Sequence, residues 1–307
     1  MFGHVDNCIM NASGALCTSQ EELDNLNKSK SGLMISKSCS LYPRTGNDKP
    51  RYFHNDTLSI NSMGLPNEGI EFYIQQLFQK PYIISIAVMD IQETLTMLNM
   101  ALPLKHISAV ELNVSCPNVV NKNTVMAYHP DKLEEFLILL KTLPNPLKKP
   151  IGLKLSPYWE AQQFIDVSDL ILKYQIDFIT TINSVPNCLV LDTHTESPVI
   201  SPKNGIGGLG GICIKPVVLS NVFQFHRLIP NVPIIGCGGV ETGEDVFQLI
   251  LAGASLVQVG TALMRENIEV FERLNNELKK IMESKGYNDI EDFRGKIKEN
   301  VSNVSEY

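Results

Sequence analysis

Eight short apolar runs, separated by helix-patterned stretches, constrain the fold of this chain more than any other feature. Each run is nearly continuously apolar, as is typical of parallel strands that are covered on both faces. The runs predict strands at residues 8–13, 32–38, 82–88, 108–115, 151–156, 178–183, 233–239 and 255–261. Amphipathic stretches predict helices at residues 68–79, 90–104, 130–142, 160–174, 215–228, 242–252 and 267–284. Eight strands with intervening helices favour an α/β fold, a (β/α)₈ TIM barrel, over a doubly wound sheet.

Two connections are too long for ordinary links between a strand and a helix. They span residues 38–67 and 184–214, and both carry many polar residues and glycines. Long loops inside compact domains are usually functional or disordered. We expect inserted loops at the C-terminal mouth of one barrel domain that spans residues 1–307.

Composition indicates a soluble, cytoplasmic protein without nucleic-acid or membrane partners. The formal net charge is −7, and an acidic surface repels phosphate backbones and anionic lipid. Seven scattered cysteines form no C-x-x-C pair, which indicates neither a disulfide framework nor a zinc site. We see no signal peptide, and the longest apolar segment, near residues 82–89, is far below the ~20 residues that span a bilayer.

Polar or glycine residues follow seven of the eight predicted strands. In a barrel these C-terminal strand ends converge on one mouth, where active sites are built. The residues concerned are Asn11, Ser13, Lys37, Ser38, Asn113, Ser115, Cys116, Lys154, Asn183, Ser184, Gly238, Gly239, Gly260 and Thr261.

Three glycine clusters lie late in the chain, at residues 205–211, 236–240 and 260–261. One such cluster alone is best explained by a tight turn, because glycine tolerates positive φ. Three together favour a phosphate-bearing cofactor, since barrels often bind phosphate after strands seven and eight. None shows the G-x-G-x-x-G spacing of a dinucleotide fold.

Lys37, Lys154 and Cys116 are candidates for the chemistry. Each lysine lies within an apolar strand, and it either reaches water at the strand end or faces a group that becomes negative during reaction. Cys116 is either a small buried apolar residue or a reactive thiol, and a general base is at least as plausible as a nucleophile. The six histidines show no spacing typical of metal ligands, and we predict no metal site.

Ordered motifs from residue 7 to residue 298 closely resemble dihydroorotate dehydrogenase. They include MNASG (10–14), SKSCSLYPRTGNDKPRY (36–52), NSMGLPN (61–67), ELNVSCPN (111–118), GLKLSPYW (152–159), INS (182–184), KNGIGGLGG (203–211), GCGGVETGEDVF (236–247) and VQVGTAL (257–263). NSMGLPN and KLSPYW resemble the soluble, fumarate-linked class 1A. The membrane-bound class has an N-terminal helical extension and a serine base, and this chain resembles it in neither respect.

The resemblance implies a set of ligand-binding residues at the barrel mouth. FMN would contact Ala12, Ser13, Gly14, Lys37, Ser38, Asn113, Lys154 and Ile182, with its phosphate on Gly211, Gly238, Gly239, Gly260 and Thr261. The substrate would contact Lys37, Asn61, Ser62, Met63, Gly64, Leu65, Asn113, Asn118, Asn183 and Ser184. Lys154 would stabilise negative charge on the reduced flavin, and asparagines suit a ligand edged with both N–H and C=O groups.

The resemblance also implies the reaction and the assembly. Cys116 would take a proton from C5 of dihydroorotate while hydride passes from C6 to FMN, which yields orotate for pyrimidine biosynthesis. Fumarate would reoxidise the flavin and leave as succinate, and the protein would be a homodimer. Because a free thiol titrates near 8.5, the oxidative half-reaction should accelerate as the pH rises towards that value.

Two other hypotheses compete with this one. The first is an FMN barrel that acts on free uracil, a tRNA uridine or another dihydropyrimidine, or that uses another electron acceptor. The acidic balance disfavours a tRNA substrate, and Lys37 with the NSMGLPN loop favours a small carboxylate. The second is a flavin- or orotate-binding paralogue without turnover, which the presence of Cys116, Lys37 and Lys154 disfavours.

Overall fold

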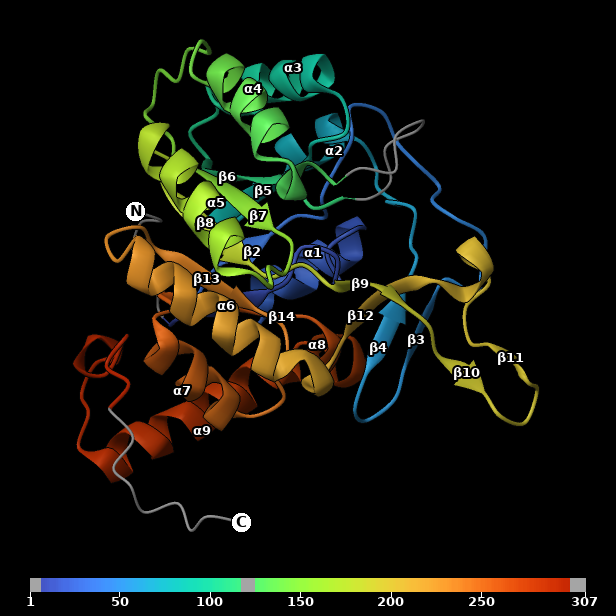
Figure 1. Cartoon of the computed structure of the whole chain (residues 1–307), viewed down its shortest axis with the longest axis vertical. Coiled ribbons are helices and arrows are strands. Elements are labelled where there is room, and N and C mark those ends of the chain that lie inside the picture. Colours follow the sequence, from blue (N-terminus) through green and yellow to red (C-terminus); the bar gives the residue numbers. More distant parts are fainter. Residues whose placement is uncertain (1–6, 117–124, 299–307) are drawn as a thin grey trace.

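A closed parallel barrel forms the centre of the computed structural model, which describes residues 7–116 and 125–298 (Figure 1). Around the ring its strands are β1 (Ile9–Asn11), β14 (Leu256–Val259), β13 (Ile234–Cys237), β8 (Phe178–Thr181), β7 (Ile151–Leu155), β6 (Ile107–Asn113), β5 (Tyr82–Ala87) and β2 (Met34–Ile35). A parallel bridge between Met10 and Leu33 joins the two ends of this order, and Gly32 N–H donates to the Ile9 carbonyl at 2.9 Å. The predicted (β/α)₈ barrel is therefore confirmed, and each strand overlaps its predicted range.

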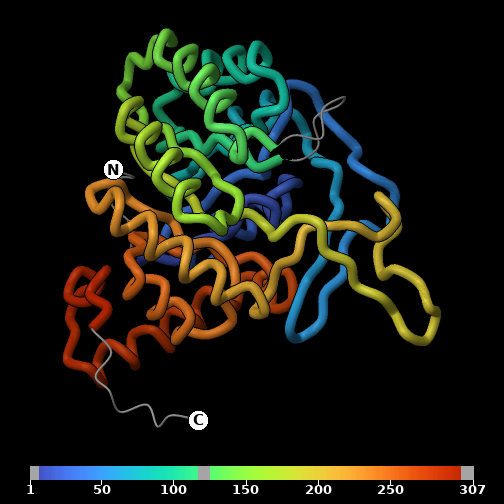
Figure 2. The backbone as a smooth tube through the Cα atoms, in the orientation of Figure 1, coloured from blue at the N-terminus to red at the C-terminus, as the bar shows by residue number. Residues whose placement is uncertain are grey.

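Most of the predicted helices are present, and they surround the barrel (Figure 2). Those within the predicted ranges, to within a residue, are α3 (Ile91–Ala101), α4 (Pro130–Leu140), α5 (Ala161–Lys173), α6 (Lys215–Leu228), α7 (Gly243–Ala252) and α9 (Glu269–Lys285). The helix predicted at 68–79 is shorter, α2 (Ile70–Ile74). Beyond its end, Phe78 packs edge-on against Tyr82 at a centroid separation of 4.9 Å. Phe78 is half-buried in this contact, which explains an apolar residue at 78 without a helix there.

Two helices were not predicted, α1 (Gln20–Lys28) and α8 (Thr261–Glu266). Ser19 and Glu22 form a reciprocal capping box at the start of α1. The helix buries only Leu23 and Leu26, so it offers few apolar residues from which a pattern could be recognised. Its capping signature, a serine followed three residues later by glutamate, is a local signal that apolar periodicity alone does not reveal.

The two long connections pair with each other in a second, antiparallel sheet. Its strand order is β3 (Tyr52–His54), β4 (Ser59–Asn61), β12 (Gly207–Gly210) and β9 (Val185–Cys188). A small hairpin of β10 (Leu191–Asp192) and β11 (Ser197–Pro198) extends from it. Figure 1 shows this sheet beside the barrel, away from α7 and α9. The inserted loops were predicted, whereas their pairing was not.

Within the described part of the chain, every helix is too short or too polar to cross a membrane.

Candidate active site

A cavity of about 380 Å³ opens at the C-terminal ends of the barrel strands, between the barrel and the second sheet. This volume lies within the range of small-molecule and cofactor pockets. Every ligand-contacting residue predicted from the resemblance lines it, as does Cys116, except for Asn118, which lies outside the described residues. Of the other predicted strand-end residues, Ser115 lines the cavity, whereas Asn11 is buried away from it and its amide donates to the Ile35 carbonyl at 2.8 Å. The predicted residues that line the cavity are Ala12, Ser13, Gly14, Lys37, Ser38, Asn61, Ser62, Met63, Gly64, Leu65, Asn113, Cys116, Lys154, Ile182, Asn183, Ser184, Gly211, Gly238, Gly239, Gly260 and Thr261.

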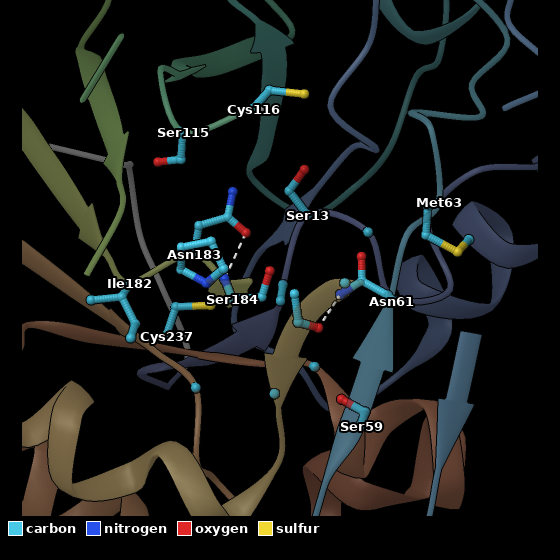
Figure 3. A pocket seen from close by; sticks show the side chains of 18 of the residues that line it. Ser13, Ser59, Asn61, Met63, Ser115, Cys116, Ile182, Asn183, Ser184 and Cys237 are labelled. Carbon is cyan, nitrogen blue, oxygen red and sulfur yellow. Dashed lines mark hydrogen bonds between the residues drawn. The ribbon is translucent and has the colours of Figure 1, made fainter. Parts of the chain in front are cut away.

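Parallel strand direction explains why residues so distant in sequence meet here. Asn113 is the last residue of β6, Lys154 lies near the end of β7, and Gly238 directly follows β13. All these strands deliver their C-terminal ends to the same rim. The second sheet adds the opposite wall, because β4 and β12 pair Asn61 with Gly208 and the Asn61 amide donates to the Gly208 carbonyl at 3.1 Å (Figure 3).

Asn113 organises one part of the cavity wall through hydrogen bonds. Its amide nitrogen donates to Ser38 Oγ at 3.1 Å, and its amide oxygen accepts from the Asn183 amide at 3.3 Å. Ser38 Oγ in turn lies 2.9 Å from Ser13 Oγ. Side chains that follow four different strands are thus held in fixed orientations, as a binding site requires.

Lys37 and Lys154 are both buried at the cavity wall, and their environments act on them differently. Burial is the largest effect on Lys37 and lowers the pKa of its ammonium group. Burial alone would also lower the pKa of Lys154, but nearby Cys237 and Glu111 outweigh it, and the pKa is raised above its ordinary value. Burial raises the pKa of the Cys237 thiol, so we assign the net effect on Lys154 at neutral pH to the Glu111 carboxylate. The nearby Glu111 carboxylate therefore favours the ammonium form of Lys154.

Cys116 follows the turn after β6, and its side chain lines the cavity (Figure 3). It is only 7% exposed. The adjacent Ser115 hydroxyl donates to the Lys154 carbonyl at 2.8 Å, which fastens this turn to the neighbouring strand. None of the seven cysteines, all of which are described, is in a disulfide.

The glycines that follow β12 and β13 both form tight turns and line the cavity. Gly238 and Gly239 have φ of +117° and +68°, and a Cβ on Gly239 would lie 2.5 Å from the Lys215 backbone. A Cβ on Gly211, with φ of +90°, would lie 2.6 Å from the Leu58 backbone. Turn geometry and packing therefore demand glycine at these positions. The same residues line the cavity, where their lack of side chains leaves the backbone open to a ligand.

The charge of the cavity wall differs from that of the whole chain. Among the described residues that line it are Lys37, Lys154 and Lys203, and none is Asp or Glu. The chain as a whole carries a formal net charge of −7. A basic pocket in an acidic protein favours an anionic ligand, because poorly hydrated walls strengthen the attraction.

Several lining residues were not predicted from the sequence. They include Tyr52, Ser59, Tyr128, Ser156, Asn187, Lys203 and Cys237. Lys203 and Cys237 lie inside motifs that had been singled out, so their neighbours were a usable signal. Ser59 hydrogen-bonds Thr261 across 2.8 Å, a contact that depends on the second sheet and has no signature in the sequence.

The fold and this cavity define a (β/α)₈-barrel protein with a basic, glycine-lined small-molecule site at its C-terminal mouth. The family model for dihydroorotate dehydrogenase matches residues 3–282. The chain belongs to the dihydroorotate dehydrogenase family.

Relatives named for their electron acceptor match over nearly the whole chain. Dihydroorotate dehydrogenase (fumarate) of Saccharomyces mikatae is 43% identical over 304 residues, and that of Lachancea kluyveri is 44% identical over 301 residues. A putative dihydroorotate dehydrogenase A (fumarate) of Streptococcus agalactiae is 42% identical over 300 residues. Each alignment covers 95% of both proteins. The resemblance to the fumarate-linked class is confirmed at the level of sequence.

A solved structure supports the fold independently. The dihydroorotate dehydrogenase of Eimeria tenella, in complex with ferulenol, aligns with a TM-score of 0.75 over 94% of this chain and 85% of that one. Because the two sequences are only 19% identical, this likeness bears on the fold alone.

Proposed function

We propose that this protein oxidises dihydroorotate to orotate with a bound FMN and passes the electrons to fumarate. The observation that carries the proposal is the gathering of every described predicted site residue around one basic cavity at the barrel mouth. Family membership and the names of relatives that align over 95% of their length support the substrate and the acceptor.

The cavity suits FMN in three respects. Gly211, Gly238 and Gly239 leave backbone surface open to a phosphate, and Thr261 adds a hydroxyl beside them. Lys154, whose pKa is raised above its ordinary value, would offer a cation to a ring that gains negative charge on reduction. The other residues of the proposed flavin-contacting set also line the cavity: Ala12, Ser13, Gly14, Lys37, Ser38, Asn113, Ile182 and Gly260.

Substrate recognition is assigned to the asparagines and to Lys37. Asn61, Asn113 and Asn183 supply both amide donors and amide acceptors, which suit a pyrimidine edged with N–H and C=O groups. Lys37 supplies a positive charge for the substrate carboxylate. The remaining proposed contacts are Ser62, Met63, Gly64, Leu65 and Ser184, together with Asn118, which is outside the described residues.

Cys116 is assigned as the general base, which takes the proton from C5 of dihydroorotate. When bound, FMN supplies a two-electron acceptor for the hydride that leaves C6. The cavity wall around Cys116 excludes bulk water from the buried thiol, and Ser115 anchors its turn to β7. A positioned base of this kind contributes roughly 10²–10⁴-fold to the rate.

The electron acceptor is tested by steady-state assays on the purified chain. Dihydroorotate oxidation with fumarate is compared with oxidation supported by NAD and by a soluble quinone. We expect turnover with fumarate to exceed the others by at least about tenfold. Equal or faster turnover with NAD or the quinone would reject fumarate while leaving the dehydrogenase assignment intact.

A cytoplasmic location and a homodimer stay predictions that rest on the family resemblance. Sedimentation of the holoenzyme at micromolar concentration tests the dimer, for which a mass of twice 34.2 kDa is expected. A single species at the monomer mass would contradict it.

A further inference from the structure

A carboxylate is buried inside the barrel, below the cavity. Glu111 lies on β6, and its side chain is fully inaccessible to solvent. Barrel interiors are ordinarily filled with branched apolar residues, and burying a charge is costly unless hydrogen bonds and an opposite charge compensate it. Glu111 is not assigned to the cavity or to the reaction proposed above, so its presence calls for a physical explanation.

Three side chains from three other strands donate hydrogen bonds to this carboxylate. Thr180 of β8 donates at 2.6 Å, Gln258 of β14 at 3.1 Å and Ser85 of β5 at 3.2 Å. The carboxylate thus has donors on both of its oxygens, which is the pattern that stabilises the charged form.

Gln258 connects Glu111 to the cavity. Its amide nitrogen donates to Glu111, while its amide oxygen accepts from Lys154 Nζ at 3.2 Å. An amide bridges a cation and an anion in only one orientation, with oxygen towards the cation and nitrogen towards the anion. The bridge therefore favours the state in which Lys154 and Glu111 are both charged.

We propose that Glu111, acting through Gln258, is a positioning residue that holds Lys154 as an ammonium ion at the cavity wall, and thereby sets how readily a flavin bound there is reduced. This inference rests on the proposed function, since it assumes FMN in the cavity. Without the carboxylate, Lys154 is a buried amine beside a neutral amide, and burial favours its uncharged form. Reduced flavin would then lose its nearby positive charge.

The other ionisable groups near Lys154 do not replace Glu111. Cys237 on β13 lies 3.8 Å from Lys154 Nζ, but burial keeps it a neutral thiol. Cys17, whose pKa burial raises to about 11, is likewise neutral at physiological pH. Burial lowers the pKa of Lys37, and its ammonium form can only disfavour a second ammonium nearby. Among these groups Glu111 is the source of negative charge.

The test is potentiometric titration of bound FMN as a function of pH in the holoenzyme. In Glu111→Gln, the midpoint potential of the flavin should fall more steeply with rising pH than in the wild type, because Lys154 loses its proton. At alkaline pH, the equilibrium between the flavin and a redox dye should therefore lie about tenfold or more further from reduced flavin than in the wild type. The added step should vanish when Glu111→Gln is combined with Lys154→Met, because Lys154 is the group that titrates. Thr180→Val is the matched control, since it removes a hydrogen bond to the same carboxylate but leaves the Gln258 bridge, and it should follow the wild-type pH profile.

Two results would overturn the inference. One is a curve of midpoint potential against pH for Glu111→Gln that overlays the wild-type curve, and the other is an added step that persists when Glu111→Gln is combined with Lys154→Met. A purely structural role would lower stability in both backgrounds without a lysine-dependent step. If Glu111→Gln does not retain FMN, Gln258→Met is tested in its place. This variant breaks the bridge to Lys154 but leaves Glu111 its hydrogen bonds from Thr180 and Ser85. A wild-type dependence of the midpoint potential on pH in Gln258→Met would also reject the inference. If the wild-type protein binds no FMN, the proposed function fails first, so the two failures are distinguishable.

Discussion

At the scale of single residues, the central claim is that Cys116 is the base. Cys116→Ala removes the thiol from a buried position at the cavity wall and leaves the glycines and lysines in place. We expect the variant to bind FMN normally and to reduce it with dihydroorotate roughly 10²–10⁴-fold more slowly. Rapid mixing without oxygen, followed by the loss of the yellow flavin absorbance, measures this rate.

Cys8→Ala is the matched control for that experiment. Cys8 is also buried, but it directly precedes β1 and does not line the cavity. Its loss should leave the rate of flavin reduction within about twofold of the wild type, since volume-reducing changes away from the site act on stability. Undiminished reduction in Cys116→Ala would remove the thiol from the mechanism.

At the scale of elements, the second sheet positions the substrate-binding residues. A Cβ on Gly208 would lie 2.1 Å from Ser184 Oγ, and the Gly208 carbonyl accepts the Asn61 amide. Gly208→Ala should therefore displace Ser184 from its position beside Asn61 and raise KM for dihydroorotate about tenfold or more, because misplaced polar contacts lose binding energy. FMN content should be unchanged, which absorbance spectra of the purified variant test.

Gly286→Asn controls for the loss of a glycine with positive φ. Gly286 ends α9 in the left-handed region, a Cβ added there would meet nothing within 4 Å, and asparagine tolerates that conformation. Kinetics of this variant should match the wild type. An unchanged KM in Gly208→Ala would show that the second sheet does not set substrate contacts.

The start of α7 predicts a dependence of stability on pH. Asp245 accepts hydrogen bonds from the backbone N–H groups of Glu241 and Thr242. It also forms an ion pair with Lys215, whose Nζ lies 2.6 Å from Asp245 Oδ1. Burial would raise the pKa of this carboxyl, but these contacts outweigh it and lower the pKa. Its stabilisation is therefore complete above the unfolded pKa near 3.9 and is lost as the pH falls through the folded-state value. Asp245→Ala should cost roughly 2–4 kcal/mol at neutral pH.

Denaturant unfolding at neutral pH and near pH 3 checks this expectation. The difference between Asp245→Ala and the wild type should shrink in acid. Glu291→Ala, which removes an exposed partner of Arg294, should cost less than about 1 kcal/mol at neutral pH. A constant difference for Asp245→Ala across pH would contradict the assigned cause.

Elements with a local signal were predictable from the sequence, and elements made by distant pairing were not. The apolar runs at 82–88 and 151–156 identify β5 and β7 because burial on both faces leaves a continuous apolar pattern. The pairing of β4 with β12 joins residues 147 positions apart, and nothing local in SIN or GGLG specifies it. The site residues were identified by motif resemblance and strand-end position, whereas Glu111 and Gln258 lie within the motifs at 111–118 and 257–263 but not at strand ends, and nothing in the motifs indicates their role.

At the scale of the whole molecule, the cavity is assembled from strands all round the barrel, so ligand binding should stabilise the entire fold. A ligand that binds only the folded state adds about 2.7 kcal/mol at a hundredfold excess over its Kd. We expect removal of FMN to lower the Tm by several degrees and re-addition to restore it. Differential scanning calorimetry of both forms tests this, and identical Tm values would show that FMN does not bind the folded cavity.

The most direct test of the account is anaerobic mixing of the FMN-loaded wild-type protein with dihydroorotate, followed by addition of fumarate. If residues from all round the barrel form one flavin and substrate site, dihydroorotate should bleach one flavin per chain and fumarate should restore the yellow colour. A flavin that stays oxidised in excess dihydroorotate would contradict the account and favour a protein that binds these ligands without turnover.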